Sequence, residues 1–264
     1  MTKLEIGSHD IRSPVAPDSR QEDPATTPGG LPSQAARAER ILDAAGELLL
    51  RIGYRRVTVE DIAQRADVGK GTVYLHWKSK QELLAVLLLR EIGEVMRELV
   101  DGMRRDVAEV RLHRVMRSLF AAIMGRPLAK ALYTRDVETL GRLAAGDVGG
   151  IRTWQQTSAV SFDAYLDLLT EHGLLRASAD RKTQDYALHA TTSGFYLIEQ
   201  FLPDELRLPL EGKADCLAEV VRLTFEPPGE PDPQTLRAVA PRAITLFDEM
   251  RAQCDPHTSQ STTR

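Results

Sequence analysis

Three residues, Asp67-Val68-Gly69, constrain the fold of this 264-residue chain more than any other part of it, because they interrupt a helical pattern only briefly. The pattern before the break predicts a short helix over about Val59 to Ala66, with Thr58 as its N-cap. The pattern after the break predicts a helix over about Lys70 to Trp77. Two short helices joined by so tight a turn indicate a helix-turn-helix, the motif whose second helix lies in the major groove of DNA.

A further helix is predicted before these two short helices, and it would pack against them and stabilise them. Apolar residues recur at helical spacing between Ala36 and Ile52, and Gly53 stands where a left-handed C-cap would end the helix. Behind the pair, Ser79 opens a long helix that continues to about Met103. Residues 33–80 are therefore predicted to form a three-helix domain.

Charge is distributed unevenly along the chain. Residues 33–80 contain nine Lys or Arg against six Asp or Glu, a net charge of +3, whereas the whole chain carries -4, so the remaining residues sum to -7. A small basic domain joined to a larger acidic body is a pattern typical of proteins that bind polyanions. A charge of +3 is weak evidence by itself, so the position of the cations matters more.

Hydrogen-bond donors gather around the start of the helix predicted at Lys70. Gly69 and Gly71 let backbone N–H groups approach a phosphate at the positive end of that helix. Side-chain donors surround the same end and would fix the register on a duplex: Lys70, Thr72, Tyr74, His76 and Lys80. The core of the domain is assigned Val68, Val73 and Trp77. His76 is open between a phosphate donor and an ordinary surface histidine.

The same segment resembles the TetR family of bacterial transcriptional regulators. The resemblance covers about residues 36 to 82 and is carried by Thr58, Ile62-Ala63, Ala66, Val68, Gly71-Thr72, Tyr74, His76 and Lys80. It implies an all-α homodimer with an N-terminal three-helix DNA-binding domain, followed by a variable, larger helical ligand-binding and dimerisation domain. Proteins of this family usually act as repressors that a small molecule releases from the operator.

The resemblance also implies a set of DNA contacts. By position these are Thr58, Lys70, Thr72, Tyr74, His76 and Lys80, and Gly71 joins them through its backbone. Two positions depart from the common pattern, since Asp67 stands where the turn usually has glycine and Gly69 where a serine commonly caps the next helix. Aspartate tolerates a left-handed conformation and glycine is an acceptable N-cap, so the turn is expected to survive. The departure puts in doubt the phosphate contact that the serine makes.

Proline and glycine divide the rest of the chain. Residues 1–32 are predicted to be a disordered leader and residues 255–264 a disordered tail, which leaves residues 81–254 as the larger helical domain. No strand pattern occurs, so the predicted fold class is all-α. Periodicity predicts helices in the larger domain over about 81–103, 107–124, 128–143, 151–172, 179–201, 213–225 and 234–253.

Several classes of protein are disfavoured. The apolar run Leu83 to Leu89 is far shorter than the roughly 20 residues of a membrane span, and no apolar N-terminal stretch suggests secretion. Cys216 and Cys254 offer neither metal spacing nor a disulfide framework, which favours free thiols in a reducing cytoplasm. The sequence has no phosphate loop, metal-ligand pair or Gly-x-Ser-x-Gly elbow, so we expect no enzyme activity, catalytic residue, metal or cofactor.

A homodimer is expected to form through two helices of the larger domain and to place two recognition helices on a palindromic operator. The helix over 179–201 carries a run of small residues, Ala190 to Gly194, which permits close helix approach. The last helix carries an apolar stripe made of Leu236, Val239, Ile244, Leu246 and Phe247. The alternative is that both faces only complete the core of the protomer.

An effector cavity is expected in the same domain, because Met and amphipathic aromatic side chains are more numerous there than packing requires. The candidate lining residues are Met116, Phe120, Met124, Tyr133, Trp154, Gln155, Phe162, Tyr165, His189, Phe195 and Tyr196. They favour a largely apolar or aromatic ligand. Two alternatives stay open: a DNA-binding regulator whose larger domain only dimerises or binds a protein, and a helical interaction module whose helix-turn-helix contacts protein.

Overall fold

The computed structural model describes residues 33–140, 150–176 and 180–254, and within these ranges it contains α-helices and short 3-10 helices but no β-strand. The all-α prediction is confirmed. The predicted leader 1–32 and tail 255–264 lie outside the described residues. The helices are α1 Gln34–Arg56, α2 Val59–Arg65, α3 Lys70–His76, α4 Lys80–Arg105, α5 Leu112–Met124, α6 Pro127–Tyr133, α7 Val137–Leu140, α8 Ile151–Glu171, α9 Arg181–Leu197, α10 Leu210–Phe225 and α11 Pro233–Ala252.

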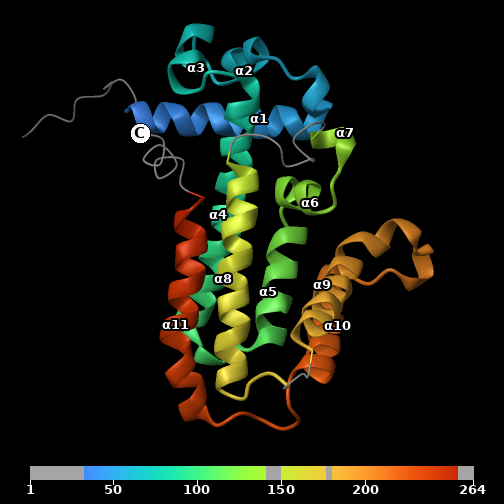
Figure 1. Cartoon of the computed structure of the whole chain (residues 1–264). Helices are drawn as coiled ribbons and strands as arrows, with labels where there is room; N and C mark the ends of the chain where they lie inside the picture. Colours follow the sequence, from blue (N-terminus) through green and yellow to red (C-terminus); the bar gives the residue numbers. More distant parts are fainter. Residues whose placement is uncertain (1–32, 141–149, 177–179, 255–264) are drawn as a thin grey trace, which may run out of the picture.

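The first three helices lie together at one end of an elongated molecule, and α4 runs from them into a helical bundle (Figure 1). α11 packs along α4 and α8, α10 packs along α5, and α9 lies beside α10. One apolar core is continuous from Ile41 of α1 through Leu87 of α4 to Phe247 of α11. The helix-turn-helix is therefore joined to the body by shared packing as well as by the chain.

Local sequence explains where the short helices begin. Thr58 and Asp61 form a capping box on α2: the Asp61 N–H donates to the Thr58 hydroxyl at 3.1 Å, and the Thr58 N–H donates to the Asp61 carboxylate at 3.0 Å. Ser79 caps α4 by accepting from the Glu82 N–H at 3.1 Å. The predicted starts of both helices are confirmed.

The end of α1 differs from the prediction. Gly53 has φ 74° and ψ 161°, a conformation that essentially only glycine adopts, instead of the left-handed helical cap. One more turn, Tyr54 to Arg56, follows it, so the helix kinks at Gly53 and does not stop there. A kink and a cap both favour glycine, and the sequence does not distinguish them.

Two helices that were predicted to be continuous are broken. The one over 107–124 divides into a 3-10 helix, Val107–Val110, and α5, because Arg111 between them is extended. The one over 128–143 divides into α6 and α7 at a turn in which Arg135 has φ 52°, and its residues 141–143 lie outside the described residues. Apolar spacing continues across both breaks, so periodicity alone does not register them.

Near the C-terminus the helix boundaries follow the predictions more closely. α8 ends before Gly173, which has φ 68°. α9 stops at Leu197 and a 3-10 helix, Ile198–Phe201, completes the segment that was predicted as one helix. None of the described helices is both long and apolar enough to cross a bilayer.

Candidate DNA-binding surface and ligand cavity

α3 is buried on one side and open on the other. Val73 and Trp77 are buried and Val68 is partly buried, as predicted. On the outer side Tyr74 is 47% exposed and Leu75 is 81% exposed. α3 therefore has its own core to fix it and a free face at the end of the molecule.

The turn before α3 has the geometry that the sequence predicts. Asp67 has φ 53°, the left-handed conformation, and Gly69 is the N-cap with φ -70° and ψ 146° and no side-chain cap. A Cβ atom on Gly71 would meet nothing within 4 Å, so packing inside the chain does not require glycine there. The Thr72 N–H donates to the Gly69 carbonyl at 2.9 Å, whereas the N–H groups of Lys70 and Gly71 have no acceptor four residues earlier in the helix and could bind an anion.

Lys70 forms an ion pair with Glu60, an acid that sequence reasoning did not single out. Its ammonium group is ion-paired with Glu60 of α2 and lies 5.9 Å from the centre of the Tyr74 ring. The hydrogen bond from Lys70 lowers the pKa of the Glu60 carboxyl below its ordinary value. Lys70 and Glu60 are both on the surface, so a phosphate would compete with Glu60 for the same cation.

Lys80 is held by the protein itself. Its Nζ donates to the carbonyl oxygens of Tyr54 and Val57, both at 2.9 Å, and lies 4.3 Å from the centre of the Tyr54 ring. Burial lowers its pKa. Two of the three ammonium donors thus join the start of α4 to the end of α1, and a phosphate contact by Lys80 stays a prediction.

Thr58 and His76 also have partners inside the domain. The Thr58 hydroxyl donates to the Asp61 carboxylate at 2.7 Å. The His76 ring lies 5.2 Å from the Trp77 ring, and burial together with the charge of Arg37 lowers its pKa, which favours the neutral imidazole at neutral pH. Thr72 is half-buried beside the turn.

Leu75 was missed by sequence reasoning. An apolar residue on a short helix is assigned to the core by default, and only the packing shows that this one faces outward.

A cavity of about 560 Å³ lies in the body, lined by residues from α4, α5, α6, α8, α9, α10 and α11 and by Arg135 after α6. Seven of the eleven predicted lining residues are on it: Met116, Tyr133, Trp154, Gln155, Phe162, His189 and Tyr196. The lining residues that the sequence did not single out are Met96, Leu119, Leu132, Arg135, Ser158, Ala159, Leu188, Thr192, Ser193, Leu197, Leu217, Phe247 and Met250. Helical spacing from Trp154 leads to Ser158 and Phe162, but no local signal points to Arg135.

The structure does not place the other four predicted residues, Phe120, Met124, Tyr165 and Phe195, on this cavity. Phe120 is fully buried against the rings of Phe195 and Tyr196. Tyr165 is fully buried and its hydroxyl donates to the Val110 carbonyl at 2.8 Å. An apolar or aromatic residue in a helical body is as suitable for the core as for a cavity wall, so composition could not separate the two.

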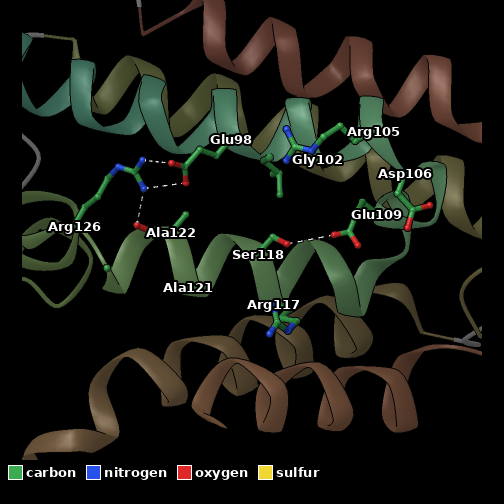
Figure 2. A pocket seen from close by; sticks show the side chains of 12 residues that line it. Glu98, Gly102, Arg105, Asp106, Glu109, Arg117, Ser118, Ala121, Ala122 and Arg126 are labelled. Carbon is green, nitrogen blue, oxygen red and sulfur yellow. Dashed lines mark hydrogen bonds and ion pairs between the residues drawn. The ribbon is translucent and has the colours of Figure 1, made fainter. Parts of the chain in front are cut away.

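A second hollow, of about 960 Å³, is a groove between α4 and α5 with charged and small residues along it (Figure 2). Arg126 reaches across it to Glu98 and donates to the Ala122 carbonyl at 3.1 Å. The Ser118 hydroxyl donates to Glu109 at 3.4 Å, near the other end. Because charged side chains line this groove, it is a weaker candidate for an apolar ligand than the cavity.

The apolar stripe of α11 is used inside the protomer. Leu236, Val239, Leu246 and Phe247 are buried and Ile244 is partly buried, which corrects the expectation that this stripe meets a second copy. α9 behaves differently, since Leu188 is its only buried residue. We use "α9 surface" for the exposed apolar residues on it and after it: Tyr186, Leu197, Ile198 and Phe201.

Comparison with known proteins agrees with the geometry of the first domain. Residues 41–87, which span most of α1 to the first turns of α4, match the model of the bacterial regulatory proteins of the tetR family. Over these residues the chain has the N-terminal domain of a tetR-family regulator.

Curated transcriptional regulators match this chain over part of their length. The fatty acid metabolism regulator protein of Bacillus subtilis is 30% identical over 87 residues, 33% of this chain and 45% of the relative. The repressor KstR of Rhodococcus jostii is 32% identical over 116 residues, 44% of this chain and 54% of the relative. The chain thus spans about half the length of these relatives.

Solved structures extend the likeness to the body. FadR from Bacillus subtilis, in complex with stearoyl-CoA, superposes with a TM-score of 0.53 at 17% identity and covers 69% of this chain and 96% of its own. NalD, a repressor of a multidrug efflux pump in Pseudomonas aeruginosa, superposes with a TM-score of 0.52 at 19% identity and covers 73% of this chain and 98% of its own. At these identities the likeness establishes a shared fold.

The described residues hold no cluster of three or more His, Cys, Asp or Glu side chains placed to bind a metal.

Proposed function

We propose that this chain is a sequence-specific, DNA-binding transcriptional regulator that acts as a homodimer in the cytoplasm, and that a small, largely apolar ligand releases it from its operator. The observation that carries the proposal is the free face of α3. A helix packed from behind by Val73 and Trp77, with Lys70, Tyr74 and Leu75 on its open side, has the chemistry that binds phosphates and base edges.

The α9 surface supports the dimer. Exposed apolar residues gathered on a weakly packed helix are typical of a protein interface. A two-fold axis through this surface would give two copies of α3 a half-site separation of about 34 Å, one turn of DNA.

The cavity supports ligand control, because its walls reach the first domain by two routes. Met96 on the wall belongs to α4, the helix that begins directly behind α3. Arg135 on the wall is followed by α7, which packs against α1. A ligand that prefers one arrangement of these helices would change the separation of the two α3 helices, and about 1–3 kcal/mol of coupling is enough for a useful switch.

Fluorescence anisotropy with a labelled random duplex tests the DNA-binding part of the proposal. We expect binding at low salt, and we expect Lys70→Ala to weaken it for all duplexes and to reduce the slope of log K against log salt by about one. Tyr74→Phe should weaken binding with little change in slope. No binding at low salt would instead favour a helical module that contacts protein.

The ligand part is tested by thermal denaturation in the presence of apolar compounds. We expect a raised melting temperature and loss of the duplex signal with the same compound. DNA binding without any thermal shift would favour a regulator whose larger domain only dimerises or binds a protein.

A further inference from the structure

The cavity contains a buried hydroxyl that makes no hydrogen bond. Ser158 lines the cavity from α8 and is 8% exposed. Its Oγ is the one buried side-chain oxygen or nitrogen without a partner among the residues that the structure describes. The neighbouring Thr157 hydroxyl, by contrast, donates to the Thr153 carbonyl at 2.8 Å. A buried hydroxyl without a partner is unfavourable, so Ser158 indicates a group that the ligand brings.

The charge of the cavity wall is one-sided. Among the described residues that line it, the wall has no Asp or Glu, and Arg135 is the only Lys or Arg. The next residue, Asp136, already has partners for its carboxylate. It accepts from the N–H of Thr139 at 3.1 Å and from the Thr139 hydroxyl at 2.8 Å. Within the described part of the chain the Arg135 guanidinium has neither an ion pair nor a hydrogen bond. A free guanidinium beside an acid-free wall favours an anion.

Two phenols add neutral donors to the same wall. The rings of Tyr133 and Tyr196 lie 5.4 Å apart. Burial raises the pKa of Tyr133 to about 12 and that of Tyr196 well above its ordinary value, so both hydroxyls keep their protons. Together with Ser158 and Arg135, these two hydroxyls provide several hydrogen-bond donors for the acceptor groups of a ligand. None of the four groups is an anion that would compete with the ligand.

We propose that the ligand of this cavity is an amphipathic anion whose carboxylate-like head pairs with Arg135 and whose second polar group hydrogen-bonds to Ser158. Its apolar body lies against the remaining wall, which includes Trp154, Phe162 and Met250. The inference rests on the proposed function, since it names the chemistry of the effector.

Probes that share one apolar body test the head group. We would measure the dissociation constants of decanoate, 1-decanol and decylamine by calorimetry, with a naphthyl series of the same three head groups beside them. The account predicts that in at least one series the carboxylate binds about tenfold or more tightly than the alcohol, and that the amine binds most weakly.

Arg135→Gln should remove the advantage of the carboxylate and leave the affinity for the alcohol unchanged, which a merely structural role of Arg135 would not do. Arg237→Gln, an exposed arginine of α11 away from the cavity, is the matched control and should leave both affinities unchanged. Equal binding of carboxylate and alcohol in both series, or a preference that survives Arg135→Gln, would overturn the proposal.

Monohydroxylated decanoates test Ser158, because the series places a hydroxyl at each distance from the carboxylate. One member should bind several-fold more tightly than decanoate, and Ser158→Ala should abolish this gain without weakening decanoate itself. Thr157→Val, which removes the neighbouring hydroxyl, should preserve the gain. A series with no such member would contradict the role of Ser158.

Anisotropy with duplex DNA, run on the same samples, separates this inference from the proposed function. If uncharged or cationic probes bind and release the protein from DNA, the proposed function stands and the anionic ligand is wrong. If no probe binds while DNA binding persists, both the anionic ligand and ligand control are contradicted. Loss of DNA binding in the absence of any probe would contradict the proposed function itself.

Discussion

The carbonyl oxygen of Glu138 lies 2.9 Å from the position that a Cβ atom on Gly53 would occupy. Gly53 is the kink of α1, in the DNA-binding domain, and Glu138 belongs to α7, the short helix that follows Arg135 on the cavity wall. The absence of a side chain at Gly53 therefore allows a close backbone contact between the two parts of the molecule, in addition to the covalent link through α4.

Gly53→Ala should disrupt this contact. A positive φ with ψ 161° strains any other residue by about 1–3 kcal/mol, and the new methyl group also collides with backbone that cannot move like a side chain. Gly173→Ala is the control for a positive φ without a collision, because Gly173 has φ 68° and nothing within 4 Å of its Cβ position. Thermal denaturation should show a larger loss of stability for Gly53→Ala, and equal losses would mean that the contact with α7 contributes nothing.

Glu60→Gln should strengthen binding to duplex DNA of any sequence by about two- to tenfold at low salt, since it frees Lys70 and removes a negative charge beside α3. Glu219→Gln on α10, which also breaks an exposed ion pair with a neighbouring arginine, is the control and should have no effect. Anisotropy titrations at several salt concentrations decide the matter. Unchanged affinity in Glu60→Gln would indicate that Lys70 does not approach phosphate.

Leu75→Ala should reduce sequence selectivity and leave non-specific affinity unchanged. An exposed apolar side chain on a recognition helix suits the methyl group of thymine, so its loss is expected to cost about three- to tenfold on the preferred site only. The exposed Leu50 of α1 provides the control substitution. Equal losses on preferred and random duplexes would show that Leu75 acts through the stability of α3.

A buried ionic network should control stability at low pH. The Glu226 carboxylate accepts from the Arg111 guanidinium at 3.1 Å and from the His113 N–H at 2.9 Å, and it ties the end of α10 to the start of α5. Burial by itself raises the pKa of Glu226, but the hydrogen bonds and charges of His113 and Arg111 outweigh it and hold the pKa below the ordinary value.

Because the folded-state pKa is the lower one, the stabilisation is fully present above the ordinary pKa of a glutamate and is lost as the pH falls through the folded value. Glu226→Gln should lower the free energy of unfolding by up to about 3 kcal/mol at neutral pH, since it removes the buried counter-charge of Arg111 and leaves only the exposed Glu230 paired with it. The variant should also lose less stability than the wild type on acidification. Denaturant titrations of both proteins at several pH values test this prediction. The same dependence of the unfolding free energy on pH in the two proteins would contradict it.

The DNA-binding domain could be predicted largely from sequence because its signals are local. The capping box at Thr58, the left-handed Asp67 and the cap at Ser79 each depend on a few adjacent residues, and each occurs as expected. The partners of Lys70 and Lys80 could not be predicted, because they come from α2 and from the end of α1 and depend on how the helices pack.

The presence of an apolar cavity could be predicted from the sequence, but its charged and polar groups could not. Met116, Trp154 and Phe162 could be proposed from residue type and spacing, whereas Arg135 reaches the wall only because a turn replaces the predicted helix there. Residue type also gave no means to separate the buried stripe of α11 from the exposed α9 surface, since both are apolar and helical. That distinction depends on long-range packing.

The most direct test of the account is selection of binding sites from random duplex DNA with the full chain, followed by sequencing of the retained duplexes. The account predicts enrichment of a palindromic sequence whose half-sites lie about one helical turn apart, bound by two copies of the chain. Retention of no duplex at low salt, or enrichment of a single unpaired half-site by a monomer, would contradict it.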